Sequence, residues 1–171
     1  MWVRDAEQAL RINSEGANAT YHPELILSDN ISASENLESV VSNAEYVLVA
    51  TPSLIFEQII SRLAPYIHSS VSIISCTKGI QPDPFRTMTE IISHHLGHII
   101  GNQIGALSGP NLAKEIAEQK IAGTVIASSN SELTSNIKLM LSSPTFKVFS
   151  SSDIQGVELA GALKNIYAIC C

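Results

Sequence analysis

Two lysines in this sequence stand where an ammonium group could do chemistry. Lys78 precedes Gly79 in a loop that directly follows a predicted buried strand. Lys164 is the one basic residue in residues 156–165, which are mostly apolar or small and predict a helix with a partly buried face that carries this charge. A lysine at a strand end can hold a phosphate or carboxylate as a point charge, and an amine on a partly buried face is a candidate general base. The structural alternatives are a solvated loop lysine and a lysine whose stem reaches solvent from a core helix.

The turn from Ser108 to Asn111 is a third candidate for a ligand site. Residues 104–107 predict the end of a buried strand, Gly109 and Pro110 interrupt it, and Asn111 is expected to cap the next helix. Ligands of open α/β sheets bind beyond the carboxyl ends of the strands, where this turn would offer free amide groups. This segment alone is better interpreted as an ordinary strand-to-helix turn. The presence of Lys78 and Lys164 at the ends of other elements favours a ligand site.

Two further segments are placed to contact a nucleotide. Arg4 follows the remnant of a strand, at the position where dinucleotide-binding folds read the adenosine ribose. An arginine there favours the 2′-phosphate of NADP, whereas the neighbouring Asp5 keeps NAD open. Residues 51–53, with Pro52 at their centre, would line the nucleotide side of the crevice or form a plain turn.

The histidines near residue 95 raise the question of a metal site. His94 and His98 lie one helical turn apart, which is a spacing that metal sites use. No carboxylate or cysteine accompanies them at ligand spacing, and Gly97 marks a helix end. We therefore expect no metal here, and the sequence carries no nucleophile elbow, phosphate loop or paired-acid motif.

Strands and helices that alternate along the chain must position these residues. Compact apolar runs predict buried strands at 46–50, 71–75, 103–107, 123–127 and 145–149. Helices are predicted from Asp5 to Asn13, from Ser34, and at 53–63, 85–96, 111–117, 131–141 and from Asp153 onward. A loop is predicted at 21–29 and a short strand at 31–33. Alternation at this pitch predicts an α/β fold, Rossmann-like and doubly wound around a mostly parallel sheet.

Composition and charge narrow the class of protein. The 171 residues suit one domain with a sizeable core, and the formal charge of −6 argues against a nucleic-acid partner or an anionic membrane surface. The apolar runs are too short for membrane insertion. Three cysteines, Cys76, Cys170 and Cys171, lack disulfide or zinc spacing, which fits reduced thiols in a cytoplasmic protein.

Three motifs, in order and spacing, resemble the NAD(P)-dependent glycerol-3-phosphate dehydrogenase family, and the bacterial biosynthetic type more than the eukaryotic one. They are Cys76-Thr77-Lys78-Gly79, Ser108-Gly109-Pro110-Asn111-Leu112-Ala113-Lys114-Glu115 and Ala162-Leu163-Lys164-Asn165. Residues 2–5 and 49–53 are similar to the family as well, so the resemblance runs over nearly the whole chain.

The resemblance implies an oxidoreductase that interconverts sn-glycerol 3-phosphate and dihydroxyacetone phosphate with NADP or NAD and feeds glycerophospholipid synthesis. Lys164 would accept the proton of the substrate C2 hydroxyl, with Asn165 beside it. The substrate-binding residues would be Lys78, Gly109, Asn111 and Lys164, and the cofactor-binding residues Arg4, Pro52, Lys78 and Ala113. Asn111 departs from the threonine or serine expected there, although an amide also donates a hydrogen bond.

The family's first strand with its glycine-rich turn, and its C-terminal helical domain, have no counterpart in the sequence. Residues 1–152 are therefore expected to be a partial dinucleotide-binding domain, and residues 153–171 the start of the helix leading into the C-terminal domain. We expect such a piece to be poorly folded and inactive alone, and a homodimer is a candidate assembly of the full-length protein.

Two alternatives stay open at this point. One is a related 3-hydroxyacid or 6-phosphogluconate-type dehydrogenase, which also carries a lysine on a late helix. The other is a nucleotide-fold binding domain without catalysis.

Overall fold

The computed structural model describes residues 1–19 and 21–170, with the backbone alone for Tyr167. The chain forms two compact units, residues 1–44 and residues 45–171, and each is described by itself. No helix within the described residues is long and apolar enough to cross a lipid bilayer.

The first unit is built on a capped helix and a small strand pair. Its elements are α1 (Ala6–Glu15), β1 (Ala17–Asn18), β2 (His22–Ile26) and α2 (Leu37–Val41). Asp5 caps α1 by accepting a 2.9 Å hydrogen bond from the Glu7 amide, and Gly16 closes the helix with a left-handed φ of 61°. The helix predicted from Asp5 is thus confirmed, and Ala9 and Ile12 bury its inner face against Ala33.

Two predictions for the first unit are wrong. The loop expected at 21–29 contains β2, which pairs with β1 in an antiparallel two-stranded sheet. Pro23 lies within β2, and a proline is tolerated there because the pair has an open edge that needs no donor. Residues 31–33 form no strand; a single parallel bridge joins Trp2 to Ser34 instead. The cap of α2 is Asn36, whose side chain accepts from the Ser39 amide.

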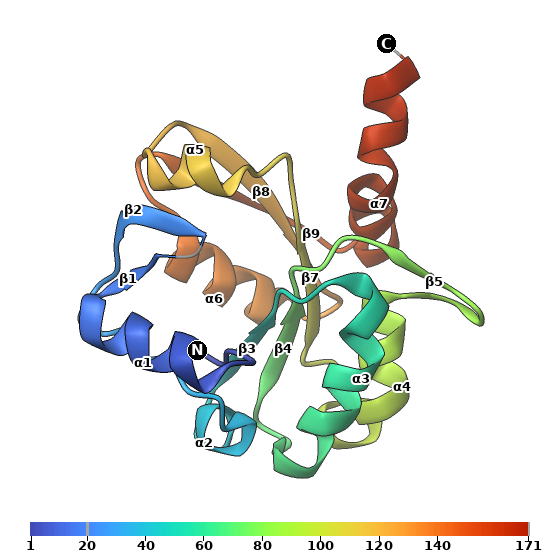
Figure 1. The fold of residues 1–171 in the computed structure, drawn as a ribbon. Helices are drawn as coiled ribbons and strands as arrows, with labels where there is room; N and C mark the ends of the chain where they lie inside the picture. Colours follow the sequence, from blue (N-terminus) through green and yellow to red (C-terminus); the bar gives the residue numbers. More distant parts are fainter. Residues whose placement is uncertain (20, 171) are drawn as a thin grey trace. The chain divides into compact units, whose positions relative to one another are not determined.

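The second unit is a five-stranded sheet with helices on both faces (Figure 1). Its strand order is β3 (Tyr46–Val49), β4 (Ser72–Ser75), β7 (Ile104–Ser108), β8 (Ala122–Ala127) and β9 (Phe146–Ser151). The helices are α3 (Ser53–Leu63), η1 (Ala64–Tyr66), α4 (Met88–Ile100), α5 (Ala113–Ala117), α6 (Ser131–Leu141) and α7 (Ile154–Cys170). A hairpin of β5 (Ile80–Pro82) and β6 (Phe85–Thr87) precedes α4 and contains a cis Asp83–Pro84 bond.

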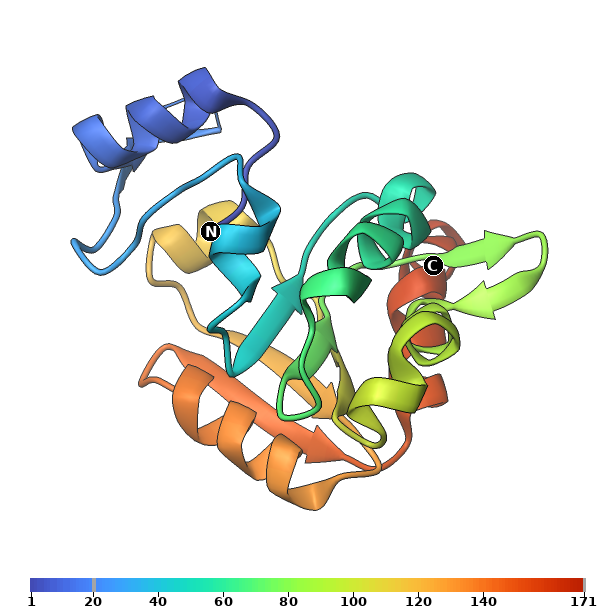
Figure 2. The same cartoon turned by 90° about the horizontal axis from the view of Figure 1, so that it is seen from below.

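The mostly parallel α/β fold is confirmed, with one antiparallel junction. β3, β4 and β7 run parallel, β8 runs against β7, and β9 runs parallel to β8. The carboxyl ends of β3, β4 and β7 and the amino end of β8 therefore share one edge of the sheet. Figure 2 shows α6 on one face, and α4 and α7 on the other.

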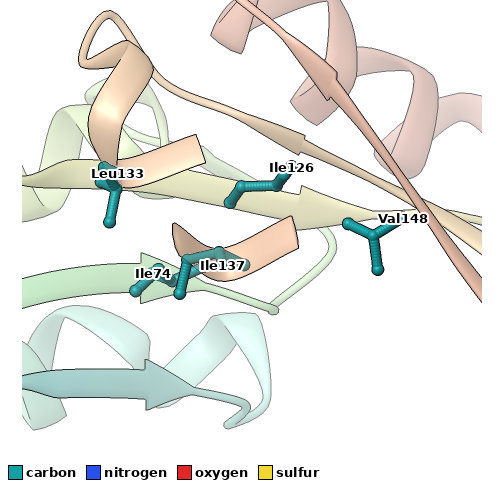
Figure 3. Packing of buried hydrophobic residues seen from close by; sticks show 5 residues of the cluster. All are labelled: Ile74, Ile126, Leu133, Ile137 and Val148. Carbon is teal, nitrogen blue, oxygen red and sulfur yellow. The ribbon is translucent and has the colours of Figure 1, made fainter. Parts of the chain in front are cut away.

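The core between the sheet and α6 is apolar and tightly closed (Figure 3). Leu133 and Ile137 lie four residues apart on α6 and pack on Ile74, Ile126 and Val148 of three strands. All four residues of β4 are buried, as expected for a central parallel strand covered on both faces.

Two helix predictions need correction. The helix expected from Phe85 begins at Met88, because Phe85–Thr87 pairs with β5 and Thr87 then forms a capping box with Glu90. On α3, the spacing of the apolar residues predicts that Ile55, Ile59, Ile60 and Leu63 face inward; Ile55 is instead 38% exposed, and Phe56 is fully buried.

Candidate functional site

Lys78 and Gly109 meet at the shared edge of the sheet. Lys78 Nζ donates a 2.7 Å hydrogen bond to the carbonyl oxygen of Gly109. Lys78 follows β4 by three residues and Gly109 directly follows β7, and these strands are adjacent and parallel, so their ends lie together. The motifs around Lys78 and Gly109, which are 31 residues apart in sequence, are therefore in direct contact in the structure.

Lys164 reaches the same edge from α7. Asp153, which the sequence predicted as the cap of this helix, accepts a 2.8 Å hydrogen bond from the Gly156 amide. The helix packs on β7, and Gly161 makes the close approach possible: a Cβ atom there would collide with Ser108 Oγ. Lys164 is one turn further along the same helix face.

A hollow of about 230 Å³ opens between α7 and the ends of β7 and β8. Its lining is mostly small or apolar, with the Lys164 ammonium as its charge; the residues are Ser108, Gly109, Pro110, Val125, Val157, Ala160, Gly161 and Lys164. A concave, largely apolar site with few polar groups is typical of small-molecule binding.

The two ammonium groups influence each other. Burial, and then the neighbouring charge of Lys164, lower the pKa of Lys78 below its ordinary value of 10.5. Within the described residues, neither lysine forms an ion pair with a carboxylate. Positive charge is therefore concentrated without an internal counter-ion, which suits an anionic ligand.

Gly109 is fixed by the antiparallel approach of β8. A Cβ atom at Gly109 would lie 2.6 Å from the Gly123 carbonyl oxygen and 2.9 Å from Thr124 Cα. Real Cβ atoms do not approach backbone so closely, so only glycine fits while the carbonyl still faces Lys78.

Asn111 does not cap α5, which corrects the prediction. Leu112, with an extended backbone, is the N-cap residue and provides no side-chain hydrogen bond. The Oδ1 atom of Asn111 is buried and has no hydrogen-bond partner among the described residues. An unsatisfied buried acceptor is costly unless a ligand donates to it. Ala113 begins the helix and is exposed.

The loops after β3 and β4 are joined on the side predicted for the nucleotide. Thr77 Oγ1 donates a 2.7 Å hydrogen bond to the Thr51 carbonyl oxygen. Gly79, with a φ of 145°, would place a Cβ atom 2.7 Å from Ser53 Cβ, so these loops are in close contact. Ser53 is a residue type that often caps helices, yet Pro52 is the N-cap residue of α3.

This loop pair fits a nicotinamide dinucleotide. Thr51 Oγ1 is buried without a partner among the described residues, and no side chain caps the first amides of α3. Free amides at a helix N-terminus and an unused hydroxyl suit the polar groups of a dinucleotide. Arg4 belongs to the first unit, where it is exposed, and Asp5 beside it is engaged as the cap of α1.

Residues 1–134 match the family model described as the N-terminus of NAD-dependent glycerol-3-phosphate dehydrogenase. The chain belongs to this family. It is 43% identical to glycerol-3-phosphate dehydrogenase [NAD(P)+] of Alcanivorax borkumensis over 99% of its own length and 48% of that protein. For the protein of the same name from Teredinibacter turnerae the identity is 39%, over 99% and 49%. The chain thus spans about half the length of the curated relatives it matches.

Solved glycerol-3-phosphate dehydrogenases have the same fold. The Coxiella burnetii structure matches 98% of this chain and 50% of its own, with a TM-score of 0.88 and 29% identity. The Plasmodium falciparum structure matches 100% and 48%, with a TM-score of 0.91 and 27% identity. A pyrroline-5-carboxylate reductase is similar in fold alone, with a TM-score of 0.66 at 11% identity. These matches resolve the choice of family in favour of glycerol-3-phosphate dehydrogenase.

Within this family member, the structure brings together some of the predicted residues and not others. Lys78, Gly109 and Lys164 share one place. Asn165 is an exposed residue of α7. Sequence reasoning overlooked the buried Glu158, although a single acid in an apolar helix was a visible signal.

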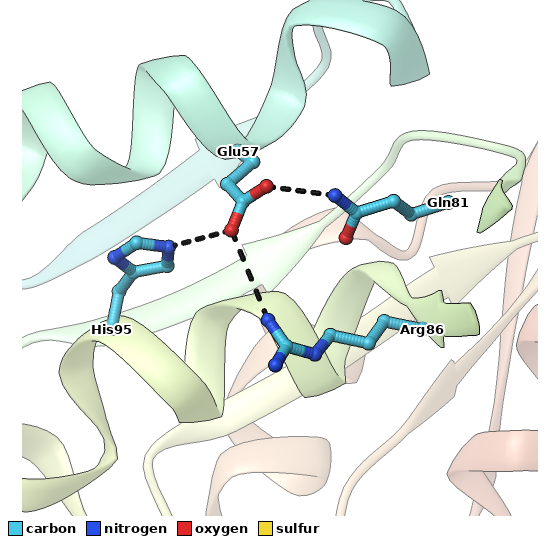
Figure 4. Close-up of polar contacts among 4 residues, drawn as sticks. All are labelled: Glu57, Gln81, Arg86 and His95. Carbon is cyan, nitrogen blue, oxygen red and sulfur yellow. Dashed lines mark hydrogen bonds and ion pairs between the residues drawn. The ribbon is translucent and has the colours of Figure 1, made fainter. Parts of the chain in front are cut away.

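The histidines lie apart from this site. His95 Nε2 is 3.0 Å from the Glu57 carboxylate, which also accepts a 2.7 Å hydrogen bond from Gln81 and lies 3.9 Å from Arg86 (Figure 4). The hydrogen bond from His95 contributes most to lowering the pKa of Glu57. The His94 and His95 rings are 5.1 Å apart, and the described residues contain no group of three or more potential metal ligands.

Cys76 is next to the site but protected. It lies two residues before Lys78, and burial raises the pKa of its thiol to about 11. Cys170, near the end of α7, is exposed.

Proposed function

We propose that the protein carrying this chain interconverts sn-glycerol 3-phosphate and dihydroxyacetone phosphate, with NADP or NAD as the redox partner. The observation that carries the proposal is the meeting of Lys78 and Lys164 beside Gly109, next to a hollow of small-molecule size. Family membership supports the substrate class, since the relatives are named glycerol-3-phosphate dehydrogenases. The chain covers about half of those relatives, so the activity is proposed for the whole protein.

The lysines divide the work on the substrate. Lys164, which lines the hollow, accepts the proton of the C2 hydroxyl during oxidation and returns it during reduction. Lys78, tied to the Gly109 carbonyl, holds its ammonium close to the same oxygen. Negative charge that develops on that oxygen is stabilised by both groups, because preorganised charges act at the moment of reaction. The bound nicotinamide cofactor supplies or accepts the hydride.

The remaining predicted residues take binding roles. Asn111, with its unpaired buried oxygen, and Asn165 on α7 orient the substrate. Pro52 and Ala113 begin α3 and α5 and border the cofactor, while Arg4 contacts its adenosine end and favours NADP.

The cellular location, the metabolic role and the assembly of the protein are part of the same proposal. Free Cys76 and Cys170 suit a reducing cytoplasm, and the product would feed glycerophospholipid synthesis. The full-length protein is proposed as a homodimer that acts on small molecules, with no nucleic-acid partner and no membrane insertion.

The test is turnover by the protein expressed from its full reading frame. Oxidation of NADPH by dihydroxyacetone phosphate is followed for the parent, for Lys164→Ala and for Lys138→Ala. Lys138 is an exposed lysine on α6 and serves as the matched control. Loss of a general base should lower kcat by about 10²–10⁴-fold in Lys164→Ala, with no loss in Lys138→Ala.

Two results would overturn the proposal. A parent that binds NADPH without turnover would establish the alternative, a nucleotide-binding domain without catalysis. A Lys164→Ala variant as active as the parent would remove the role of the lysine.

A further inference from the structure

Glu158 is a buried carboxylate with no role in the mechanism above. It is 7% exposed and accepts two hydrogen bonds from Thr89, one from the backbone amide at 2.8 Å and one from Oγ1 at 2.6 Å. Glu158 lies on α7 and Thr89 is the second residue of α4, so the contact joins elements that are 69 residues apart.

The contact is well suited to a buried charge. A carboxylate removed from water is costly unless its oxygens are hydrogen-bonded, and here each oxygen has a donor. The positive end of the α4 dipole adds further stabilisation.

Capping alone does not account for Glu158. Thr87 and Glu90 already close the first turn of α4 with a capping box from within the same segment. A second carboxylate from a distant helix is not needed to begin α4. What it adds is a fixed distance between α4 and α7.

Both ends of the Glu158–Thr89 contact are connected to a lysine of the site through short stretches of chain. On one side, Lys164 lies six residues after Glu158 on the same helix. On the other side, Thr89 follows Thr87, which pairs with Ile80 across the β5–β6 hairpin. Ile80 is two residues after Lys78. Each end of the contact is therefore connected to one lysine of the site.

A restraint is needed because the lysines repel each other. Burial, and then the neighbouring Lys164, lower the pKa of Lys78, so the closeness of the two residues disfavours the charged form of Lys78. Packing of Ser108 against Gly161 keeps α7 near β7.

We infer that Glu158 is a positioning residue: its two hydrogen bonds to Thr89 hold α7 at the height on the sheet where Lys164 faces Lys78. Its effect on turnover rests on the proposed function, whereas its effect on the lysine pair does not.

The experiment compares four variants of the full-length protein. Glu158→Ala removes both acceptors, and Glu158→Gln keeps an amide oxygen that can accept from the Thr89 amide. Thr89→Val removes one of the two donors and keeps the shape of the side chain. The matched control is Glu132→Ala, which removes an exposed carboxylate from the first turn of α6.

Two readouts separate positioning from a merely structural role. The first is kcat and KM for dihydroxyacetone phosphate, measured where every variant is folded by circular dichroism. The second is the pH dependence of acetic anhydride labelling at Lys78, read by peptide mass spectrometry, which needs no turnover. Glu158→Ala should lower kcat at least tenfold with a smaller change in KM, and raise the labelling pKa of Lys78 as Lys164 moves away. Thr89→Val should do the same to a lesser extent, and Glu158→Gln should recover most of the parent behaviour.

The inference is overturned if Glu158→Ala and Thr89→Val fold, lose only thermal stability, and keep both kcat and the Lys78 labelling pKa of the parent. If Glu158→Ala does not fold, Thr89→Val decides by the same criteria. If the parent shows no turnover, the proposed function fails, and the labelling pKa alone still decides whether Glu158 positions the lysines.

Discussion

Lys78 Nζ is held 2.7 Å from the carbonyl oxygen of Gly109, across the ends of two parallel strands. The bond uses one ammonium hydrogen and leaves two others free for a ligand. It also keeps Lys78 close to Lys164, whose charge disfavours its protonated form. The closeness of the two lysines, although unfavourable by itself, strengthens the attraction of the site for an anion.

The repulsion predicts how stability depends on pH. Below the folded-state pKa of Lys78 its ammonium is disfavoured by the neighbouring Lys164, so Lys164→Met should stabilise the protein by about 0.2–1 kcal/mol, the size of interactions between partly exposed charges. As the pH rises from that lowered pKa toward 10.5, Lys78 loses its charge and the gain should disappear. Urea unfolding midpoints at pH 7 and pH 10 measure the effect, with Lys138→Met as control. A gain that is equal at both pH values, or equal to that of the control, would contradict this account.

Gly161→Ala should damage the site although alanine is the better helix former. Its methyl group would collide with Ser108 Oγ, so either that hydroxyl or α7 must shift. Overpacking of this kind costs about 1–3 kcal/mol, which exceeds the gain of about 1 kcal/mol in helix propensity. Thermal unfolding and kcat are compared with Gly97→Ala on α4, where the new methyl group would lie 3.1 Å from Ser93 Oγ and the hydroxyl must give by only a little. Addition of Ser108→Ala to Gly161→Ala should restore part of the loss, and a double variant no better than the single one would refute the collision.

Arg4→Ala should change the choice of cofactor. An arginine guanidinium pairs with a 2′-phosphate, so its loss should raise KM for NADPH about tenfold, the size of one charge-assisted hydrogen bond, and leave KM for NADH nearly unchanged. Arg11→Ala, an exposed arginine of the same unit paired with Glu7 at 3.7 Å, is the control. Equal changes for both cofactors would assign Arg4 no part in discrimination.

The core beneath the sheet should respond according to burial. Leu133→Ala should cost about 2–5 kcal/mol, because Leu133 is 2% exposed and fills the space between α6 and β8. Leu139→Ala on the same helix should stay within about 0.5 kcal/mol, since that side chain is 83% exposed. Similar losses for both would show that α6 does not pack as described.

The fold was predictable where local chemistry decides it. β-branched runs located β3 and β4, and Asp5 and Asp153 marked helix starts through their capping side chains. Local signals failed where pairing decides, as in β2, whose Pro23 is tolerated only because the pair has an open edge.

The site was predictable where residues of local motifs follow the ends of strands. Lys78 and Gly109 were each expected just beyond a strand end, facing the crevice of the sheet, and the adjacency of β4 and β7 then brings them together. The contact of Glu158 with Thr89 depends on how two helices pack, and no spacing in the sequence encodes that. The roles assigned to the predicted residues stay predictions until turnover is measured.

The thiol of Cys76, just after β4, can report on ligand binding at this edge of the sheet through its rate of alkylation. With a pKa of about 11 it stays protonated at pH 7.5 and reacts slowly, whereas Cys170 is exposed to reagent. Site-resolved alkylation should therefore label the exposed Cys170 quickly and the partly buried Cys76 slowly. Slower labelling of Cys76 in the presence of NADPH, at constant Cys170 labelling, would record ligand closure of this edge without any engineered probe.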